Sequence, residues 1–379
     1  MPRAYHYVIW LSVIAAITAG MHVYIRWRLV VATDMARPWR SIFTILLIVL
    51  AASFPLTFFA NRVFPPFWRE IVLAIGFTWL GISFLLFAGH LAVELPRLFF
   101  GPAGSTVSRS ITWSTTGAVF ILSVFSVWNA IREPAMTHLR ITLPYLPKSL
   151  SGTTILQISD IHAGGLIPKY RIREILRNAK ELKPDLVAIT GDLVDGSAAY
   201  HAETLSMIGE LKAKYGVYFV TGNHEYYSGV EEWLSFLKNL GVRVLRNERV
   251  AIGTKEASFD LAGVDDPTGR MAPGHGTDIP KAMQGRDPGR AVVLLSHNPI
   301  QVFEAAKYDV GLVLSGHTHN GQIWPFNYLV KIHHPHITGV HHVGNTELYI
   351  SQGTGFWGPP MRFLTRGEMT LVELVSPTI

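Results

Sequence analysis

The chain has 379 residues, of which 49% are hydrophobic and only 16% are charged, and it contains no cysteine. The lack of cysteine excludes disulfides and thiolate metal sites, so any metal ion must be held by His, Asp, Asn or Glu. The net charge of +6 could point to nucleic acid, but the basic residues are scattered rather than gathered in a stripe. We therefore expect no nucleic-acid partner and attribute the charge to basic loops beside membrane segments.

Four apolar stretches before residue 132 are each long enough to cross a bilayer, which takes about 20 residues. They run over Tyr5–Ile25, Ser41–Ala60, Ile71–Val93 and Ile111–Ile131. Arginines fill the gaps and tryptophans lie near the ends, which is typical of membrane spans. We predict a transmembrane region over residues 1–135. A buried soluble bundle is the alternative, and the first stretch could also be a signal peptide, in which case three spans remain.

The arginine distribution leaves the orientation of these spans open. The first and third loops carry as many basic residues as the other side of the membrane. Discounting the residues after the last span favours these two loops on the cytoplasmic side, which places the C-terminal domain outside. His22 and His90 fall at the ends of spans, and we interpret both as structural or interfacial residues.

From about Leu139 onward, short apolar runs alternate with helical segments. Strands are predicted at Thr154–Ile158, Leu186–Thr190, Val217–Thr221, Val242–Leu245, Ser258–Ala262, Ala291–Leu295, Val310–Ser315, Leu348–Ser351 and Met369–Val375. Helices are predicted at Tyr170–Leu182 and Ala202–Lys214. This rhythm predicts an α/β domain over residues 136–379, with a two-sheet core flanked by helices and a site at the carboxyl ends of the strands.

Five short motifs follow the predicted strands. They are Asp160-Ile161-His162, Gly191-Asp192, Gly222-Asn223-His224-Glu225, Ser296-His297-Asn298 and Gly316-His317-Thr318-His319. Residues two apart on an extended segment point to the same side, which suits two ligands of one ion. Any single position could be a turn or capping residue, but five motifs in order predict a metal site. This ligand set suits Mn²⁺, Fe²⁺, Co²⁺ or Zn²⁺ better than Mg²⁺.

From about His138 to the C-terminus, these motifs resemble those of the calcineurin-like metallophosphoesterase superfamily, whose pattern is D-x-H, G-D-x-x-D, G-N-H-[DE], H and G-H-x-H. The longer segments Ile158–His162 and Gly316–Gln322 resemble a membrane-associated branch of it, and so does the segment from Gly353 to Glu368. That branch often has glycine at the position of Asn320.

The resemblance implies two metal ions, with Mn²⁺ the expected metal and Fe, Co or Zn the alternatives. The first ion would be held by Asp160, His162, Asp192 and His319, and the second by Asp192, Asn223, His297 and His317, with Asp192 bridging. His224 would bind the phosphate or protonate the leaving oxygen, and Asp195 would orient His224. Glu225 is interpreted as a supporting or surface residue.

Two segments after the ligands have open interpretations. The histidine-rich segment Ile332–His342 could bind a third metal, but we favour a mobile loop that contacts substrate phosphate beside the site. The apolar residues from Ile323 to Val330 are either core or an apolar lip that enters the membrane interface and admits a lipid tail.

These observations predict a membrane-anchored, two-metal phosphoesterase that acts on a lipid-linked phosphodiester or pyrophosphate in the bacterial inner membrane. The resembling branch includes enzymes that cleave the pyrophosphate of UDP-2,3-diacylglucosamine in lipid A synthesis, which is our leading expectation. That substrate requires a cytosolic site, whereas the arginine distribution favours the opposite side, where another envelope lipid would be the substrate. The alternatives are a phosphoprotein phosphatase, a catalytically silent metal-binding scaffold, and a separate transport function of the four spans.

Overall fold

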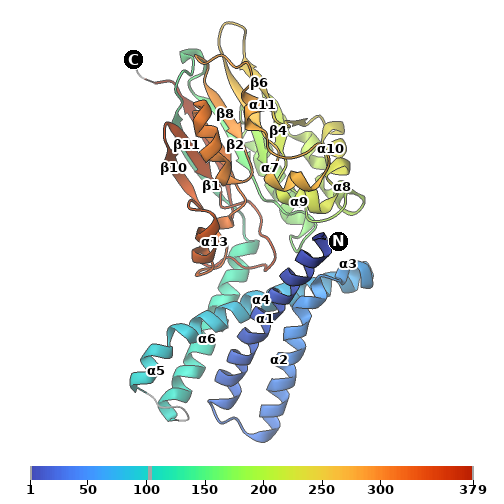
Figure 1. Ribbon diagram of the computed structural model, residues 1–379, viewed down its shortest axis with the longest axis vertical. Coiled ribbons are helices and arrows are strands. Elements are labelled where there is room, and N and C mark those ends of the chain that lie inside the picture. Colours follow the sequence, from blue (N-terminus) through green and yellow to red (C-terminus); the bar gives the residue numbers. More distant parts are fainter. Residues whose placement is uncertain (1, 101–104, 378–379) are drawn as a thin grey trace. The chain divides into compact units, whose positions relative to one another are not determined.

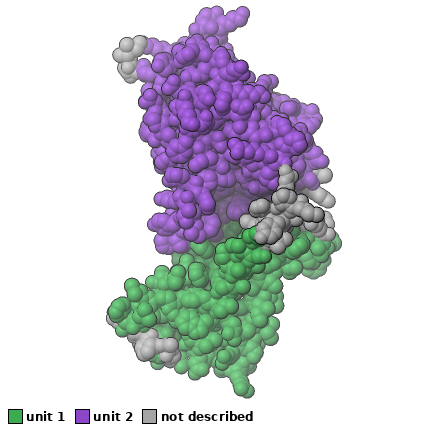
Figure 2. Space-filling model, viewed as in Figure 1, with its two compact units in different colours: residues 1–129, 358–363 green, residues 130–357, 364–379 purple. Residues whose placement is uncertain are grey.

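The computed structural model describes residues 2–100 and 105–377, and the chain forms two compact units (Figure 2). The helical unit contains the residues up to Asn129 together with Gly358–Phe363. The α/β unit contains Ala130–Trp357 and the residues from Leu364 onward. The chain therefore returns once to the helical unit, close to its C-terminus.

The helical unit is built from four long helices with two short helices between them (Figure 1). Their bounds are α1 Pro2–Arg26, α2 Arg37–Thr57, α3 Ala60–Val63, α4 Pro66–Ala92, α5 Glu94–Phe100 and α6 Thr106–Ile131. The last turn of α1 continues as a π-helical turn over Trp27–Val31. Prolines open α2 and α4, where a missing backbone N–H costs nothing.

The four long helices are apolar enough and long enough to cross a membrane. They keep large apolar side chains such as Ile17, Ile48 and Phe120 on their surface. A soluble bundle would turn such residues inward, whereas lipid accepts them on the outside. The four predicted spans are confirmed as helices.

The α/β unit contains two six-stranded sheets. The strand order of the first sheet is β1-β12-β2-β3-β4-β5, and that of the second is β10-β11-β9-β8-β7-β6. The first sheet consists of β1 Ala135–Thr142, β12 Glu368–Val375, β2 Thr153–Ile158, β3 Leu186–Thr190, β4 Val217–Val220 and β5 Arg243–Val244. The second consists of β10 Gly339–Val343, β11 Thr346–Ile350, β9 Leu312–Ser315, β8 Val292–Leu295, β7 Ser258–Gly263 and β6 Glu248–Gly253. The strands β2 to β4 run parallel, as do β7 to β9.

The core of the α/β unit has three apolar layers. Successive residues of a strand point to opposite faces, so Ile155 packs in the layer shared by both sheets while Leu156 packs in the layer shared with helices. The first sheet is covered by α7 Lys169–Glu181, α8 Ala198–Leu205 and α10 Val230–Asn239, and the second by α11 Ile279–Met283 and α12 Val302–Ala305. The predicted two-sheet core with flanking helices is confirmed.

Two sequence-based expectations differ from the structure. The helix predicted at Ala202–Lys214 begins earlier, at Ala198, and ends at Leu205 as α8; a 3-10 turn that contains Gly209, a poor helix former, follows over Ser206–Glu210. The segment Ile332–His342 is only partly a loop: residues 334–338 have no regular structure, whereas the rest holds the end of α13 (Asn327–His333) and most of β10. Because β10 is an edge strand, polar histidines are tolerated there, and they hide the alternation of apolar and polar residues that would predict a strand.

Candidate metal centre

The carboxyl ends of five strands carry every residue that the motifs single out. Asp160 and His162 follow β2, Asp192 and Asp195 follow β3, and Asn223 and His224 open α9 (Asn223–Ser228) after β4; His297 follows β8, and His317 and His319 follow β9. Within each sheet these strands are parallel, so their ends meet at one edge.

Five of these residues have a left-handed backbone. The φ angles are 54° at Asp160, 53° at His162, 50° at Asp192, 73° at His317 and 48° at His319. Such a conformation is uncommon for residues other than glycine and costs roughly 1–3 kcal/mol at each position. Its concentration at one edge indicates that the fold holds these side chains in place for a function.

The first group that could hold a metal ion consists of Asp160, His162 and His319, all buried. The Nε2 atoms of His162 and His319 lie 3.1 Å apart. The Nε2 of His319 also lies 3.3 Å from Oδ1 of Asp160. Three donor atoms from two sheets therefore face one point.

A second group consists of Asp192, His297 and His317. The Nε2 of His297 lies 3.2 Å from Oδ2 of Asp192 and 3.2 Å from Nδ1 of His317. The Oδ1 atom of Asn223 is buried without a hydrogen-bond partner. An unsatisfied buried amide oxygen is costly unless a ligand completes it.

Asp192 lies between the two groups. Its Oδ2 is 3.9 Å from Nε2 of His162, which belongs to the first group, and 3.9 Å from Nε2 of His224. His162, Asp192 and His224 form a third set within metal-binding distance. This position is the one that a bridging carboxylate would occupy.

The protonation of the imidazoles fits a cation. The Nδ1 of His297 donates to the carbonyl of Thr190 at 2.8 Å. Burial lowers the pKa of His297, but the negative charges of Asp192 and Asp160 outweigh it and raise this pKa, so Nε2 holds a proton where a cation would bind. The Nδ1 of His162 lies 3.1 Å from Oδ1 of Asp195, which leaves its Nε2 facing Nε2 of His319. Burial, together with neighbouring His297, lowers the pKa of His317 to about 3, which keeps that imidazole neutral. A divalent cation would replace the proton of His297 among these converging nitrogen and oxygen atoms, so the residues fit a metal site.

Two glycines give the ligand carboxylates room. A Cβ on Gly222 would lie 2.2 Å from Oδ1 of Asp192, and one on Gly316 would lie 2.1 Å from Oδ2 of Asp160. Neither glycine is required for its backbone angle, because neither has a positive φ. The G-N-H and G-H-x-H motifs therefore begin with glycine because the carboxylates of Asp192 and Asp160 approach the backbone there too closely for a Cβ atom.

His224 and Asp195 form a pair at the rim of the site. The Nδ1 of His224 lies 2.5 Å from Oδ1 of Asp195. Burial lowers the pKa of His224, but the negative charges of Asp192 and Asp195 outweigh it and raise this pKa to about 9. Metal cations would act in the opposite direction. Because Nδ1 faces Asp195, Nε2 is the ring nitrogen that remains available to a substrate.

Asp195 has a second partner that the motifs did not indicate. The same Oδ1 atom contacts Nδ1 of His162 as well as Nδ1 of His224. Burial raises the pKa of Asp195, but these two imidazoles hold it below its usual value. Asp195 therefore orients a metal ligand and the candidate acid together.

Glu225 is buried and connects two ligand-bearing turns. Its carboxylate accepts hydrogen bonds from the backbone N–H of Asp192 at 3.0 Å, of Leu193 at 2.8 Å and of Gly222 at 2.6 Å. Burial and the charge of Asp192 raise its pKa to about 7, against the effect of the backbone donors. The sequence interpretation left Glu225 between a supporting and a surface role, and its burial excludes the surface.

Replacing Glu225 by glutamine is expected to destabilise the α/β unit by about 1–3 kcal/mol, because an amide donor would then face backbone donors. Thermal unfolding of the purified protein measures this loss. Glu256→Gln, at an exposed glutamate, is the control and should leave the melting temperature unchanged. Equal melting of the two variants would contradict the connecting role of Glu225.

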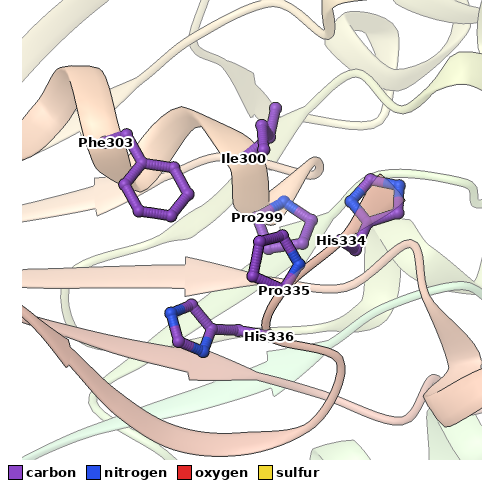
Figure 3. A pocket seen from close by; sticks show the side chains of 6 residues that line it. All are labelled: Pro299, Ile300, Phe303, His334, Pro335 and His336. Carbon is purple, nitrogen blue, oxygen red and sulfur yellow. The ribbon is translucent and has the colours of Figure 1, made fainter. Parts of the chain in front are cut away.

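The histidine-rich segment reaches the site through His334. Its ring lies 5.0 Å from the ring of His317, edge to face. His334 also lines a narrow cleft with Pro299, Ile300, Phe303, Pro335 and His336, whose side chains come from the 3-10 turn Pro299–Gln301, from α12 and from the segment after α13 (Figure 3). Within residues 2–100 and 105–377, the groups of possible metal ligands include no histidine from 332–342, so the third metal has no support.

Comparison with known proteins identifies the family of this chain. The family pattern of the calcineurin-like phosphoesterases matches residues 153–321. A "Transmembrane protein with metallophosphoesterase domain" of Danio rerio is 33% identical over 89% of this chain and 80% of its own length. An "Uncharacterized metallophosphoesterase Cj0846" of Campylobacter jejuni is 29% identical over 97% of this chain and 98% of its own. Among solved structures, a dimetal phosphatase from Danio rerio covers 54% of this chain and 88% of that chain with 14% identity, and its TM-score of 0.36 is too low to carry an argument.

The fold and the site define a metal-dependent phosphoesterase carried by a membrane protein. The chain belongs to the calcineurin-like phosphoesterase family.

Proposed function

We propose that this protein is a membrane-anchored, two-metal hydrolase that cleaves a lipid-linked phosphodiester or pyrophosphate. Two bound divalent ions, with Mn²⁺ proposed, would neutralise the phosphate and lower the pKa of a water molecule to near 7. Asp160, His162 and His319 would hold one ion and Asn223, His297 and His317 the other, with Asp192 between them. His224 would protonate the leaving oxygen through Nε2, while Asp195 fixes the imidazole through Nδ1.

The observation that supports a lipid-linked substrate is a group of exposed apolar side chains, the apolar lip, next to the proposed metal ligand His319. Of the apolar residues from Ile323 to Val330, Ile323 is buried as core, whereas an exposed set forms the lip: Trp324, Phe326, Tyr328 and Leu329, extended along α13 by Ile332. Leu329 and Ile332 lie three residues apart on α13 and are 52% and 73% exposed, so they share one side of that helix. Lys331 on the same helix adds a positive charge, which suits a phospholipid surface.

The chain ties the base of this lip to the segment that returns to the helical unit. The side chain of Gln322 donates to the carbonyl of Trp357 at 2.8 Å and accepts from its N–H at 2.9 Å. Trp357 is followed directly by Gly358–Phe363, which belongs to the helical unit.

The double variant Leu329→Ser/Ile332→Ser is expected to lower kcat/KM on a micellar lipid substrate at least about tenfold, because each side chain loses apolar contact with the lipid. Hydrolysis of soluble bis(4-nitrophenyl) phosphate should stay unchanged. Tyr145→Ser is the control, since exposed Tyr145 follows β1 at the opposite edge of its sheet. Unchanged turnover of the micellar substrate would remove the lip from the proposal.

UDP-2,3-diacylglucosamine is the first substrate to test, because it combines two acyl chains with a pyrophosphate. Purified protein with Mn²⁺ in detergent should release UMP, and an Asp192→Ala variant should not. Failure to release UMP, with bis(4-nitrophenyl) phosphate still cleaved, would move the substrate to another lipid phosphodiester. Failure on both, with metal bound, would leave a metal-binding membrane scaffold.

The proposal also includes which membrane holds the protein and which side of that membrane the catalytic domain faces. A bacterial inner membrane with a cytosolic site suits a UDP-sugar, and a reporter fused after Ile379 would test that orientation. Relatives in Danio rerio and Bos taurus favour a substrate that is not confined to bacteria. A phospholipid diester is therefore the second candidate, ahead of a phosphoprotein.

A further inference from the structure

The helical unit contains a buried charged cluster that the catalytic domain does not use. It consists of Arg28, His90, Glu94 and Arg97, and we call it the arginine cluster. The side chains of Arg28 and Arg97 are only 7% and 3% exposed, and His90 is fully buried. Arg28 lies in the π-helical turn after α1, and such turns often mark functional positions.

All four residues belong to one end of the helical unit. The first span ends at Val31 and the third at Ala92, while the fourth begins at Thr106. Thr112, which contacts Arg97, lies nineteen residues before Ile131, where α6 ends. Nineteen helical residues cover about 29 Å, the thickness of the hydrocarbon core. The arginine cluster therefore falls at headgroup depth in the leaflet away from the end of α6 that leads into β1.

The charges within the cluster do not balance. Glu94 binds Arg28 in a close salt bridge and also accepts from the hydroxyl of Tyr24. Its Oε1 lies 3.4 Å from Nη1 of Arg97, so one carboxylate serves two guanidinium groups. The Nη2 of Arg97 donates to Nδ1 of His90 at 3.1 Å and to Oγ1 of Thr112 at 3.2 Å, which are neutral acceptors. One positive charge remains without a counter-ion among these residues.

One donor of the cluster is also unsatisfied. The Nε of Arg97 is buried and has no hydrogen-bond partner. A buried charge and a buried donor without partners are both costly at the edge of a bilayer. At headgroup depth the abundant anion is lipid phosphate, and guanidinium groups bind phosphate through paired hydrogen bonds.

We propose that the arginine cluster binds the phosphate of an anionic lipid headgroup in the leaflet opposite to the one from which α6 leads into the α/β unit. A phosphodiester carries one negative charge, which matches the one positive charge left in the cluster. The bound lipid would not be the substrate, because the cluster is at the other end of α6 from β1. The site would hold the ends of the first, third and fourth spans together.

The test is lipid binding by the full-length protein after removal of its lipids in detergent. Phosphatidylglycerol should bind and raise the melting temperature, whereas phosphatidylcholine should bind more weakly because its headgroup is neutral overall. Arg97→Gln should weaken the binding of phosphatidylglycerol about tenfold, which corresponds to the loss of one charged hydrogen bond. Arg109→Gln, at a half-exposed arginine near the start of α6, is the matched control.

A second variant keeps the test decisive if Arg97→Gln folds poorly. Glu94→Gln removes the only carboxylate of the cluster, so it should tighten the binding of phosphatidylglycerol. If the cluster were only a structural salt bridge, this variant would bind the lipid no more tightly than the parent protein. The proposal is overturned if Arg97→Gln binds this lipid as well as Arg109→Gln does, or if Glu94→Gln weakens its binding. If inorganic phosphate gives the same stabilisation and competes with the lipid, the anion site stands and its lipid occupant is wrong.

Discussion

Replacing Asp192 by alanine is expected to lower kcat on bis(4-nitrophenyl) phosphate by about a thousandfold or more. Asp192 belongs to the second ligand group and also lies within metal-binding distance of His162 of the first group, so its loss should weaken both. Metal ions supply several kcal/mol of transition-state stabilisation, and each 1.4 kcal/mol is a factor of ten in rate. Metal analysis of the purified variant should show less than one ion per chain, against about two in the parent protein.

The control for this variant is Asp309→Ala. Asp309 has almost the same left-handed backbone, with φ of 51° against 50° at Asp192, but its side chain is exposed. Both variants therefore share any effect of placing alanine at this backbone angle. They differ in that only Asp192→Ala removes a proposed metal ligand. Full activity of Asp192→Ala would exclude the proposed two-metal mechanism.

Replacing His224 by alanine is expected to lower kcat by about 10²–10⁴-fold, the range of a lost general acid. The metal content should stay the same, because His224 completes neither of the two principal ligand groups. The loss should be greater for a substrate with an alkyl leaving group than for one that releases 4-nitrophenolate, since only the poor leaving group needs the proton. Steady-state kinetics on the two substrates measures this difference.

Asp195→Asn should combine two effects that His224→Ala separates. Because Asp195 contacts both His162 and His224, this variant should lose metal affinity by about 10–100-fold as well as activity. His138→Ala, at an exposed histidine of β1, is the control for both variants.

Equal losses on good and poor leaving groups in His224→Ala would assign His224 to phosphate binding instead of proton transfer.

Much of the fold was predictable because its signals are local. The four spans are runs of apolar residues, and β3 has the predicted bounds of Leu186–Thr190 because it is a short apolar run that ends at a glycine. The edge strand β10 was missed because its histidines mask the alternation that marks a strand. The α-helix predicted at Ala202–Lys214 was wrong beyond Leu205, where a 3-10 turn begins, because apolar spacing does not show where the chain must turn.

The sequence by itself determined the membrane spans, the two-sheet domain, and the residues that the motifs bring to the strand ends, because each depends on the order of neighbouring residues. Only the tertiary structure decided what those residues contact. The three backbone donors that hold Glu225, the double contact of Asp195, and the pairing of His90 with Arg97 all join positions on different elements. Such contacts depend on how helices and strands pack, and spacing along the chain does not record that packing.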